Sequence, residues 1–409
     1  MALDLTSFAA GLKTLYPAGM IEKLTYQNNP LLALMPKSED FYGDSKKCPL
    51  IYGNSQNRSN TFSNANAQTS TALMKAFLLT RGRNYSIASL DNETAEASKS
   101  NEGAFLEASK LVIDAALESL AQSNAIQMYR SGSGSIGKVK AASSPTTAIT
   151  LQEINDITNF EVGMKLNAST ADGGGSLKAD KPLITAIDRM TGIITVNSTV
   201  AGTWAADDYI FCDGDYDSAI KGLDAWLPYD NRAARLAASF FGITRNVDAS
   251  RMGGIVYNGS GSNMEEAIID GLNLGYREGG EFDYMFLNPL DVSVLVKLLG
   301  SKVQRVQVSA AINENGKQVA AVGFNGIELY YAGGNVKVIG DRSCPKGRGF
   351  GLTMKTWELA SLGKAVNLFE GDGLKWIRST SADSLDLRCY SYLQVGCKAP
   401  GRNIQINFV

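Results

Sequence analysis

The sequence of 409 residues contains no histidine. This absence removes imidazole, which is the commonest general base and the usual ligand in zinc sites. The five cysteines are scattered, odd in number and never spaced as C-x-x-C, which indicates reduced thiols that pack as small hydrophobic side chains. No pair of acids stands in a recognisable cleft pattern. We therefore predict that the protein is not an enzyme and holds no cofactor or metal.

Long apolar runs are also missing. None approaches the roughly 20 residues that cross a membrane. The N-terminus carries Asp4 and no basic start before its short apolar stretch, which disfavours a secretory signal. A formal net charge of −2 excludes a polycationic nucleic-acid binder. We expect a protein with no membrane partner that folds in a cytoplasm, with length enough for two or three domains.

The most regular pattern lies within residues 98–137. From Asn101 to Arg130 there is no proline, and the single glycine lies in the first turn. Apolar residues recur at intervals of three and four, at Phe105, Ala108, Val112, Ala116 and Leu120. This period predicts one α-helix of roughly 45 Å.

A glycine–serine loop follows this helix and ends at Gly137. It matches G-x-G-x-x-G, but a dinucleotide fingerprint needs a strand before the loop and a helix after it. Here the order is reversed. We interpret the glycines as a flexible exit from the helix.

Residues 1–45 are predicted to form an extended arm. Phe8 and Leu12 belong to a short stretch with helical spacing, and Pro17, Pro30 and Pro36 interrupt any longer helix. An arm without a core of its own packs either on its own domain or on a neighbour. The sequence leaves both alternatives open.

Residues 46–97 are predicted to form a two-stranded finger. Two β-like runs, Cys48–Tyr52 and Leu73–Leu90, flank a polar tract rich in Asn and Ser. An isolated ribbon of this kind is marginal in water, so it normally rests on another surface. The finger is basic, but it lacks the aromatic ladder of a nucleic-acid binder, which favours contact with an acidic neighbouring subunit. Our candidate inter-subunit contacts are Arg58, Lys75, Arg81 and Arg83 in the finger, and Phe8 and Leu12 in the arm.

Residues 138–215 are predicted to form an inserted small all-β domain. Their short β-like runs are Ala148–Leu151, Val162–Leu166, Leu183–Asp188, Gly192–Val196 and Tyr209–Cys212. The stretch 184–196 is typical of a hairpin.

An acidic cluster, Asp213, Asp215 and Asp217, ends this region, and Asp224 would complete a calcium-loop register. However, Ser218 replaces the required glycine, and a lysine occupies a liganding position. We predict a solvated domain junction instead.

Residues 216–409 have a mixed pattern. Helices are predicted at Met264–Gly275 and Leu290–Leu299, and strands at Phe282–Leu287, Ile327–Tyr331 and Val336–Ile339. Two β-like runs in the tail, Leu385–Gln394 and Asn403–Val409, are separated by Pro400-Gly401. The predicted fold class is α+β.

Several stretches together resemble the major capsid proteins of tailed bacteriophages, which have the Hong Kong 97-type fold. The order and spacing of these stretches, rather than any one of them, carry the resemblance. They are NEGAF at 101–105 with the long helix, MYRSGSGSIGKV at 128–139, GLDAWLP at 222–228, GGEFDYMFLNP at 279–289, IGDRSCPKG at 339–347 with the run 354–362, and the run 387–400. Residues 138–215 match weakly.

The resemblance implies a role for each region. Residues 98–137 would be the spine helix and 381–409 the closing strands of a peripheral domain. Residues 216–380 would form the axial domain, with returning peripheral segments, and meet other copies around fivefold and sixfold axes. The finger at 46–97 would be the extended loop over an adjacent subunit, and the arm would cross to another.

The resemblance also implies the function. Copies of the chain would self-assemble as hexamers and pentamers into the icosahedral shell around the double-stranded DNA genome of a tailed bacteriophage. Expected partners are a separate scaffolding protein, a portal, a decoration protein as a further candidate, and DNA on the inner face without sequence specificity. The shell would form in the bacterial cytoplasm and be located in the virion.

Three alternatives remain. The nearest is an encapsulin, a nanocompartment shell of the same fold, which the long basic finger and the inserted domain disfavour. A histidine-free enzyme is a distant second. A β-rich carbohydrate-binding or tail-fibre protein would explain 138–215 but not the long helix.

Overall fold

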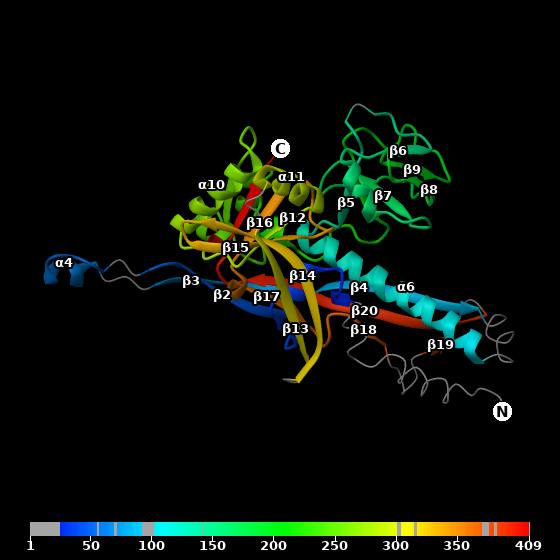
Figure 1. Ribbon diagram of the computed structural model, residues 1–409, viewed down its shortest axis with the longest axis horizontal. Coiled ribbons are helices and arrows are strands. Elements are labelled where there is room, and N and C mark those ends of the chain that lie inside the picture. The colour runs from blue at the N-terminus through cyan, green and yellow to red at the C-terminus, as the bar shows by residue number, and fades with distance from the viewer. Residues whose placement is uncertain are drawn as a thin grey trace.

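The computed structural model describes residues 25–54, 57–68, 72–91, 102–141, 143–300, 304–314, 317–369, 376–379 and 383–408. The predicted contacts Phe8 and Leu12 lie outside these residues. Figure 1 shows an elongated molecule with the finger at one end and the long helix toward the other. No helix in the described part of the chain is both long enough and apolar enough to span a bilayer.

The long helix is confirmed as α6 (Glu102–Tyr129), with 28 residues. It packs on a sheet of six strands, in which β20 (Ser384–Cys397) pairs with β17 (Trp357–Ser361), β18 (Asn367–Leu368), β19 (Trp376–Arg378) and β4 (Gly82–Asp91), and β1 (Lys37–Ser38) pairs with β17. The helix contributes Ile113, Leu117 and Leu120 to the core between the two layers. The sheet contributes Leu90 and Leu387.

A second sheet has seven strands and carries the helices α10 (Met264–Arg277) and α11 (Pro289–Leu299). Its order is β11 (Ile255–Asn258), β21 (Ile404–Asn407), β16 (Arg348–Leu352), β12 (Tyr284–Leu287), β15 (Gly334–Gly340), β14 (Lys317–Tyr331) and β13 (Gln304–Glu314). The helix side chains Ile268, Leu272 and Leu295 pack with strand residues such as Met285 and Val338. The α11 helix begins at Pro289 because the Asn288 side chain accepts the Leu290 N–H at 3.0 Å.

The closing strands of the tail are not one pair. Strand β20 lies in the six-stranded sheet, but β21 lies between β11 and β16 in the seven-stranded sheet. Asn403 fixes the crossing, since its buried Oδ1 accepts the Thr353 N–H at 2.8 Å and the Trp357 Nε1–H at 2.7 Å. The prediction that residues 381–409 close a single domain is therefore wrong for 404–407.

The finger consists of β2 (Ser45–Gly53) and β3 (Leu73–Thr80), paired antiparallel, with the short helix α4 (Phe62–Ala67) near its tip (Figure 1). The run Leu73–Leu90 was predicted as one flank, but it divides at Arg81, and β4 belongs to the six-stranded sheet. Gly82 permits this close approach: a Cβ there would lie 2.9 Å from Ile220 Cγ1 and 3.2 Å from the Leu393 carbonyl oxygen.

A second ribbon was missed by the sequence analysis. Strands β13 and β14 pair from Gln304 to Glu328, and only residues 326–331 of β14 also pair with β15. The alternation of Val306 and Val308 with polar neighbours was the available signal. Figure 1 shows this ribbon leaving the seven-stranded sheet.

The inserted domain is all-β, as predicted. One three-stranded sheet contains β5 (Ser135–Lys138), β10 (Tyr209–Cys212) and β7 (Leu166–Ser169), and another contains β6 (Ala148–Thr150), β9 (Ile193–Val196) and β8 (Ile184–Asp188). The β8–β9 hairpin is confirmed. The strand predicted at Val162–Leu166 instead begins at Leu166. A core that includes Phe160, Ile194 and Ile210 belongs to this domain.

The described part of the arm packs on its own subunit. Helix α3 (Pro30–Leu34) begins with a proline that was expected only to interrupt helices. Leu31, Leu32 and Phe41 are at most 1% exposed and join the central core. Of the two alternatives for the arm, packing on its own domain therefore applies to residues 25–41.

One buried carboxylate connects this arm to the long helix and the seven-stranded sheet. The Oδ2 atom of Asp341 accepts the Tyr129 hydroxyl at 2.9 Å and the Leu31 N–H at 3.2 Å, and its Oδ1 accepts the Ser343 N–H at 2.9 Å. Burial raises the pKa of Asp341, and these donors only partly offset that effect. The end of α6 is thereby held against the arm.

We expect Tyr129→Phe to lower the free energy of unfolding by about 1–3 kcal/mol, because Asp341 loses a buried donor. Urea denaturation of the purified subunit measures the change. Tyr85→Phe is the matched control, because Tyr85 is 58% exposed and its hydroxyl donates, on the exposed side, to the Tyr392 hydroxyl at 3.2 Å rather than to a buried carboxylate. It should cost less than about 0.5 kcal/mol. Equal losses in the two variants would contradict the role given to Asp341.

Candidate functional site

An aromatic cluster anchors the base of the finger. Trp226, at the end of α7 (Leu223–Trp226), is fully buried, and its ring lies 4.9 Å from that of Phe77 in β3 and 5.0 Å from that of Phe240. Its Nε1–H donates to the Val395 carbonyl of β20 at 3.1 Å. The Leu78 N–H donates to the Phe241 carbonyl at 3.0 Å. The inner half of the finger is therefore a fixed part of the subunit.

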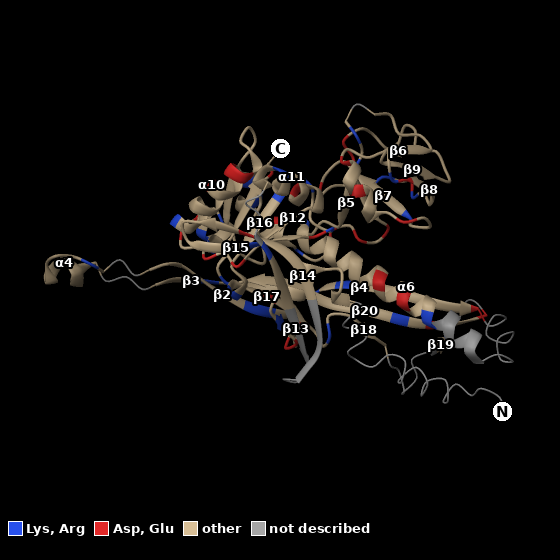
Figure 2. Ribbon diagram, viewed as in Figure 1, with Lys and Arg blue, Asp and Glu red and all other residues tan. Residues whose placement is uncertain are grey.

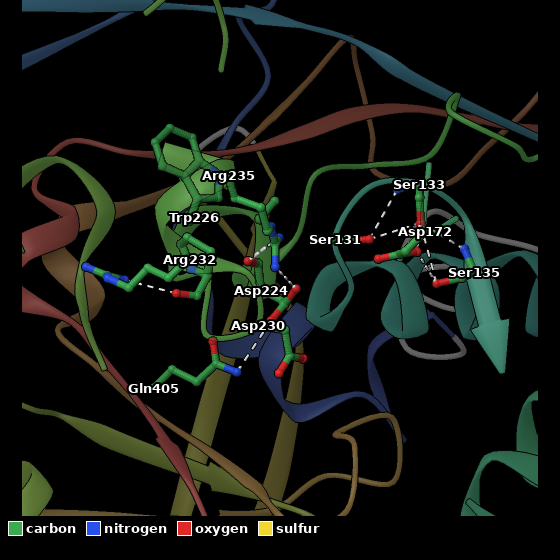
Figure 3. Close-up of polar contacts among 12 residues, drawn as sticks. Ser131, Ser133, Ser135, Asp172, Asp224, Trp226, Asp230, Arg232, Arg235 and Gln405 are labelled. Carbon is green, nitrogen blue, oxygen red and sulfur yellow. Dashed lines mark hydrogen bonds and ion pairs between the residues drawn. The ribbon is translucent and has the colours of Figure 1, made fainter. Parts of the chain in front are cut away.

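A buried charge network lies beside this cluster (Figure 3). The Asp224 carboxylate accepts Arg235 Nη1 at 2.8 Å, Arg348 Nη1 at 3.1 Å and Gln405 Nε2 at 3.4 Å. Burial alone would raise the pKa of Asp224, but the two arginines outweigh it and lower the pKa. Arg235 lies on α8 (Arg232–Ala237), Arg348 on β16 and Gln405 on β21. One carboxylate thus ties α7 to the seven-stranded sheet.

The glycine-rich loop after α6 is tightly packed. Gly134 has φ +90°, and a Cβ at this position would lie 2.3 Å from the Asp215 carbonyl oxygen. The Asp172 carboxylate accepts the hydroxyls of Ser133 and Ser135, the latter at 2.7 Å (Figure 3). The prediction of a flexible exit is therefore wrong: the glycines allow close contact between the end of the long helix and the inserted domain.

The acidic residues near 213 do not form a calcium loop. Asp213 pairs with Lys181 at 2.7 Å, Asp217 accepts the Gly174 N–H at 2.9 Å, and Asp224 belongs to the network on α7. Among the described residues, no group of three or more Cys, Asp or Glu is placed to hold a metal. Asp215 is partly buried, and burial, followed by the charge of Asp213, raises its pKa to about 6. The predicted junction is solvated only in part.

The outer half of the finger presents apolar side chains to solvent. Ile51 and Met74 are directly opposite each other across the two strands and are 58% and 60% exposed. Leu73 is 51% exposed, whereas Phe77 and Leu79 on the inner half are buried. A ribbon with this pattern covers little of its own apolar surface, so it is suited to contact with another surface.

Comparison with solved structures identifies the architecture. The cyanophage A-1(L) capsid asymmetric unit is similar over 93% of this chain and 92% of that chain, with a TM-score of 0.51 and 11% identity. This chain has the Hong Kong 97-type capsid fold. No protein-family model matches the sequence, and a search of the curated proteins finds no match.

Two further structures are similar at lower TM-scores. A structure from Mycobacterium phage Ogopogo is similar over 94% of this chain and 93% of that chain, with a TM-score of 0.44 and 10% identity. The holo-SrpI encapsulin complex from Synechococcus elongatus PCC 7942 is similar over 97% of this chain and 94% of that chain, with a TM-score of 0.42 and 7% identity. The capsid-fold assignment depends on the cyanophage match.

Within the capsid fold, α6 is the spine helix and the finger is the extended loop. The four described contact candidates are not brought together. Arg58 and Arg83 are exposed. Lys75 lies over the Tyr52 ring at 5.6 Å, and Arg81 donates to the Phe41 carbonyl at 3.2 Å. Lys75 and Arg81 therefore make contacts within their own subunit.

An apolar row on α11 was missed by the sequence analysis. Leu290, Val294 and Leu298 recur every four residues and are 51%, 44% and 46% exposed, while Leu295 and Leu299 on the other side of the helix are buried. The sequence signal for this row was that apolar residues occur on every side of α11. A helix with that pattern is normally covered on all sides.

We expect Asp224→Asn to lower the free energy of unfolding by about 1–3 kcal/mol, since the partly buried guanidinium of Arg235 loses its counter-charge and that of Arg348 keeps only Asp230. Urea denaturation at neutral pH measures it. Glu278→Gln is the control: Glu278 pairs with Arg277 at 3.0 Å, with side chains 37% and 70% exposed. Such a surface pair contributes at most about 1 kcal/mol. A loss for Asp224→Asn no larger than the control would contradict the network's role.

The raised pKa of Asp215 predicts that the stability of the protein depends on pH. Folding raises the pKa of the Asp215 carboxyl from 3.8 to about 6. Between these two pH values the carboxyl is therefore protonated in the folded protein and ionised in the unfolded chain. The resulting contribution to stability is fully present below pH 3.8 and is lost as the pH rises through about 6. Relative to Asp215→Asn, the wild type should lose on the order of 2 kcal/mol between pH 4 and pH 7. Urea denaturation across that range measures the difference, and parallel profiles for the two proteins would refute this prediction.

Proposed function

We propose that this chain is the major capsid protein of a tailed bacteriophage. Its copies assemble as hexamers and pentamers into an icosahedral shell that encloses double-stranded DNA and is located in the virion. The observation that carries the proposal is the outward apolar face of the finger, Ile51 with Met74, on a chain with a capsid fold. A monomer would leave this face in water, whereas a shell supplies a neighbour for every copy.

The surface that receives the finger is the outer face of the neighbour's spine helix. Leu111, Asp114 and Glu118 lie on one side of α6 at intervals of three and four residues, and Leu111 is 72% exposed. Figure 2 marks acidic residues of this helix in red and basic residues near the base of the finger in blue. The exposed Lys47 of β2 complements the two acids. Ile51 and Met74 would cover Leu111.

The seven-stranded sheet with α10 and α11 forms the axial part of each subunit in this proposal. The exposed row Leu290, Val294 and Leu298 faces the adjacent copies around the fivefold and sixfold axes. A separate scaffolding protein, a portal and a decoration protein complete the assembly, which forms in the bacterial cytoplasm. DNA lines the inner face without sequence specificity, and the subunit performs no catalysis.

Encapsulins share the fold, so the contents of the particle distinguish the two shell functions. The inserted domain at 138–215 and the long finger favour the phage capsid. We expect electron microscopy of the protein, expressed with its neighbouring genes, to reveal closed shells, and shells from infected cells to contain nuclease-protected DNA. A packaged enzyme in place of DNA would establish the encapsulin function, and a monomer under every condition would refute both.

One substitution tests the finger contact within the same experiment. Met74→Asp should abolish closed shells while the subunit keeps its melting temperature, because the side chain is 60% exposed in the subunit. Met190→Asp is the matched control on the β8–β9 turn of the inserted domain, where the methionine is 88% exposed. Shells that form equally well with Met74→Asp would contradict the proposed finger contact.

A further inference from the structure

A polar cleft of about 1230 Å³ lies where the end of α6, the inserted domain and the segment after α7 meet. Several of the basic residues around it are paired with acids. Arg130 pairs with Asp156 at 2.6 Å, and Arg348 pairs with Asp224 at 3.1 Å. These pairs account for much of the charge on the walls. Besides the exposed Lys346, they leave two lining cations, neither of them exposed, without a carboxylate partner among the described residues.

Lys221 and Arg245 are the exceptions. Within the described part of the chain, neither makes an ion pair with a carboxylate. Arg245 is 1% exposed. Its Nη1 donates to the carbonyls of Ala225 at 2.9 Å and Trp226 at 3.2 Å, but its buried Nε–H has no hydrogen-bond partner. The Arg245 side chain lines the cleft, although its Nε atom is covered from solvent.

The two cations lie against the same aromatic ring. The Arg245 guanidinium is 3.9 Å from the Phe240 ring centre, and the Lys221 ammonium is 5.2 Å from it. The ammonium is also 4.4 Å from the Phe241 ring centre. Contact with aromatic faces stabilises a cation, but it does not supply the counter-charge that the half-buried Lys221 and the buried Arg245 need.

The pKa values of Lys221 and Arg245 reflect the missing negative counter-charge. Burial first, and then the neighbouring Arg245, lowers the pKa of Lys221, although Asp217 opposes the change. Burial, followed by Arg235 and Arg232, lowers the pKa of Arg245 to about 9. Asp217 is itself occupied by the Gly174 N–H at 2.9 Å. An anion at the Lys221 ammonium would offset both effects.

We propose that this cleft binds a free inorganic oxyanion of phosphate size, held by the Lys221 ammonium, with the buried Arg245 guanidinium nearby adding positive charge. A free anion fits better than a backbone phosphate of DNA, because the site lies in a cleft between parts of one chain rather than along an open groove. Its walls come from both the inserted domain and the body. The proposal does not depend on the assembly function.

The test is thermal unfolding of the full-length protein in inorganic phosphate and in chloride at equal ionic strength and pH. We expect saturating phosphate to raise the wild-type melting temperature by at least about 2 °C. Lys221→Met keeps the aliphatic stem and should abolish the rise, and Lys221→Arg should restore most of it. Lys346→Met is the control, since Lys346 lines the same cleft away from the two aromatic rings, and it should keep the rise.

Two outcomes would overturn the proposal. One is an absence of any phosphate-specific rise in the wild type, and the other is an equal rise in Lys221→Met. If Lys221→Met does not fold, equilibrium dialysis of the wild-type protein with radiolabelled phosphate decides the question. Saturable binding of one phosphate per chain, displaced by sulfate, would support the site, and its absence would refute it.

Discussion

The burial of one indole ring, that of Trp226, sets the geometry on which most of the subunit depends. Its neighbours come from distant parts of the chain: Phe77 in the finger, Phe240 in the following loop and Trp357 in the six-stranded sheet, at ring distances of 4.9, 5.0 and 6.3 Å. Edge-on aromatic pairs each contribute about 0.5–1.5 kcal/mol beyond the area that they bury. The ring thereby fixes α7, and α7 in turn points Asp224 toward Arg235 and Arg348.

The same anchor explains why the finger is stiff at its base and unprotected beyond it. Phe77 and Leu79 are inside the core, whereas Ile51 and Met74, farther along the same ribbon, are exposed. The β13–β14 ribbon repeats the arrangement, since only its base is part of a wider sheet. Two-stranded ribbons are marginal in water, so such elements are stable when something covers them. A subunit with this architecture leaves apolar side chains of the finger in water when it is alone.

The sequence predicted what is local. The long helix could be recognised because thirty residues without a break share one apolar period, and the β8–β9 hairpin because its alternation and turn residues are adjacent. The failures have non-local causes. The finger ends at Arg81 because Ile220 and Leu393 close on Gly82, and the glycine loop is rigid because Asp215 approaches Gly134. The cations Lys221 and Arg245 look like ordinary surface residues until the fold places both against Phe240.

The crossing of the tail from one sheet to the other has a consequence for synthesis on the ribosome. Strand β21 lies between the edge strand β11 and β16, so β11 has no partner in the seven-stranded sheet until residues 404–407 have been made. Every other described strand of that sheet, and the whole finger, precedes them in the chain. A nascent chain can therefore form the inserted domain early, but it cannot complete this sheet before residue 407 emerges. The order of translation thus postpones the finished sheet, and the pairing of β11, until after the finger and the inserted domain have been made.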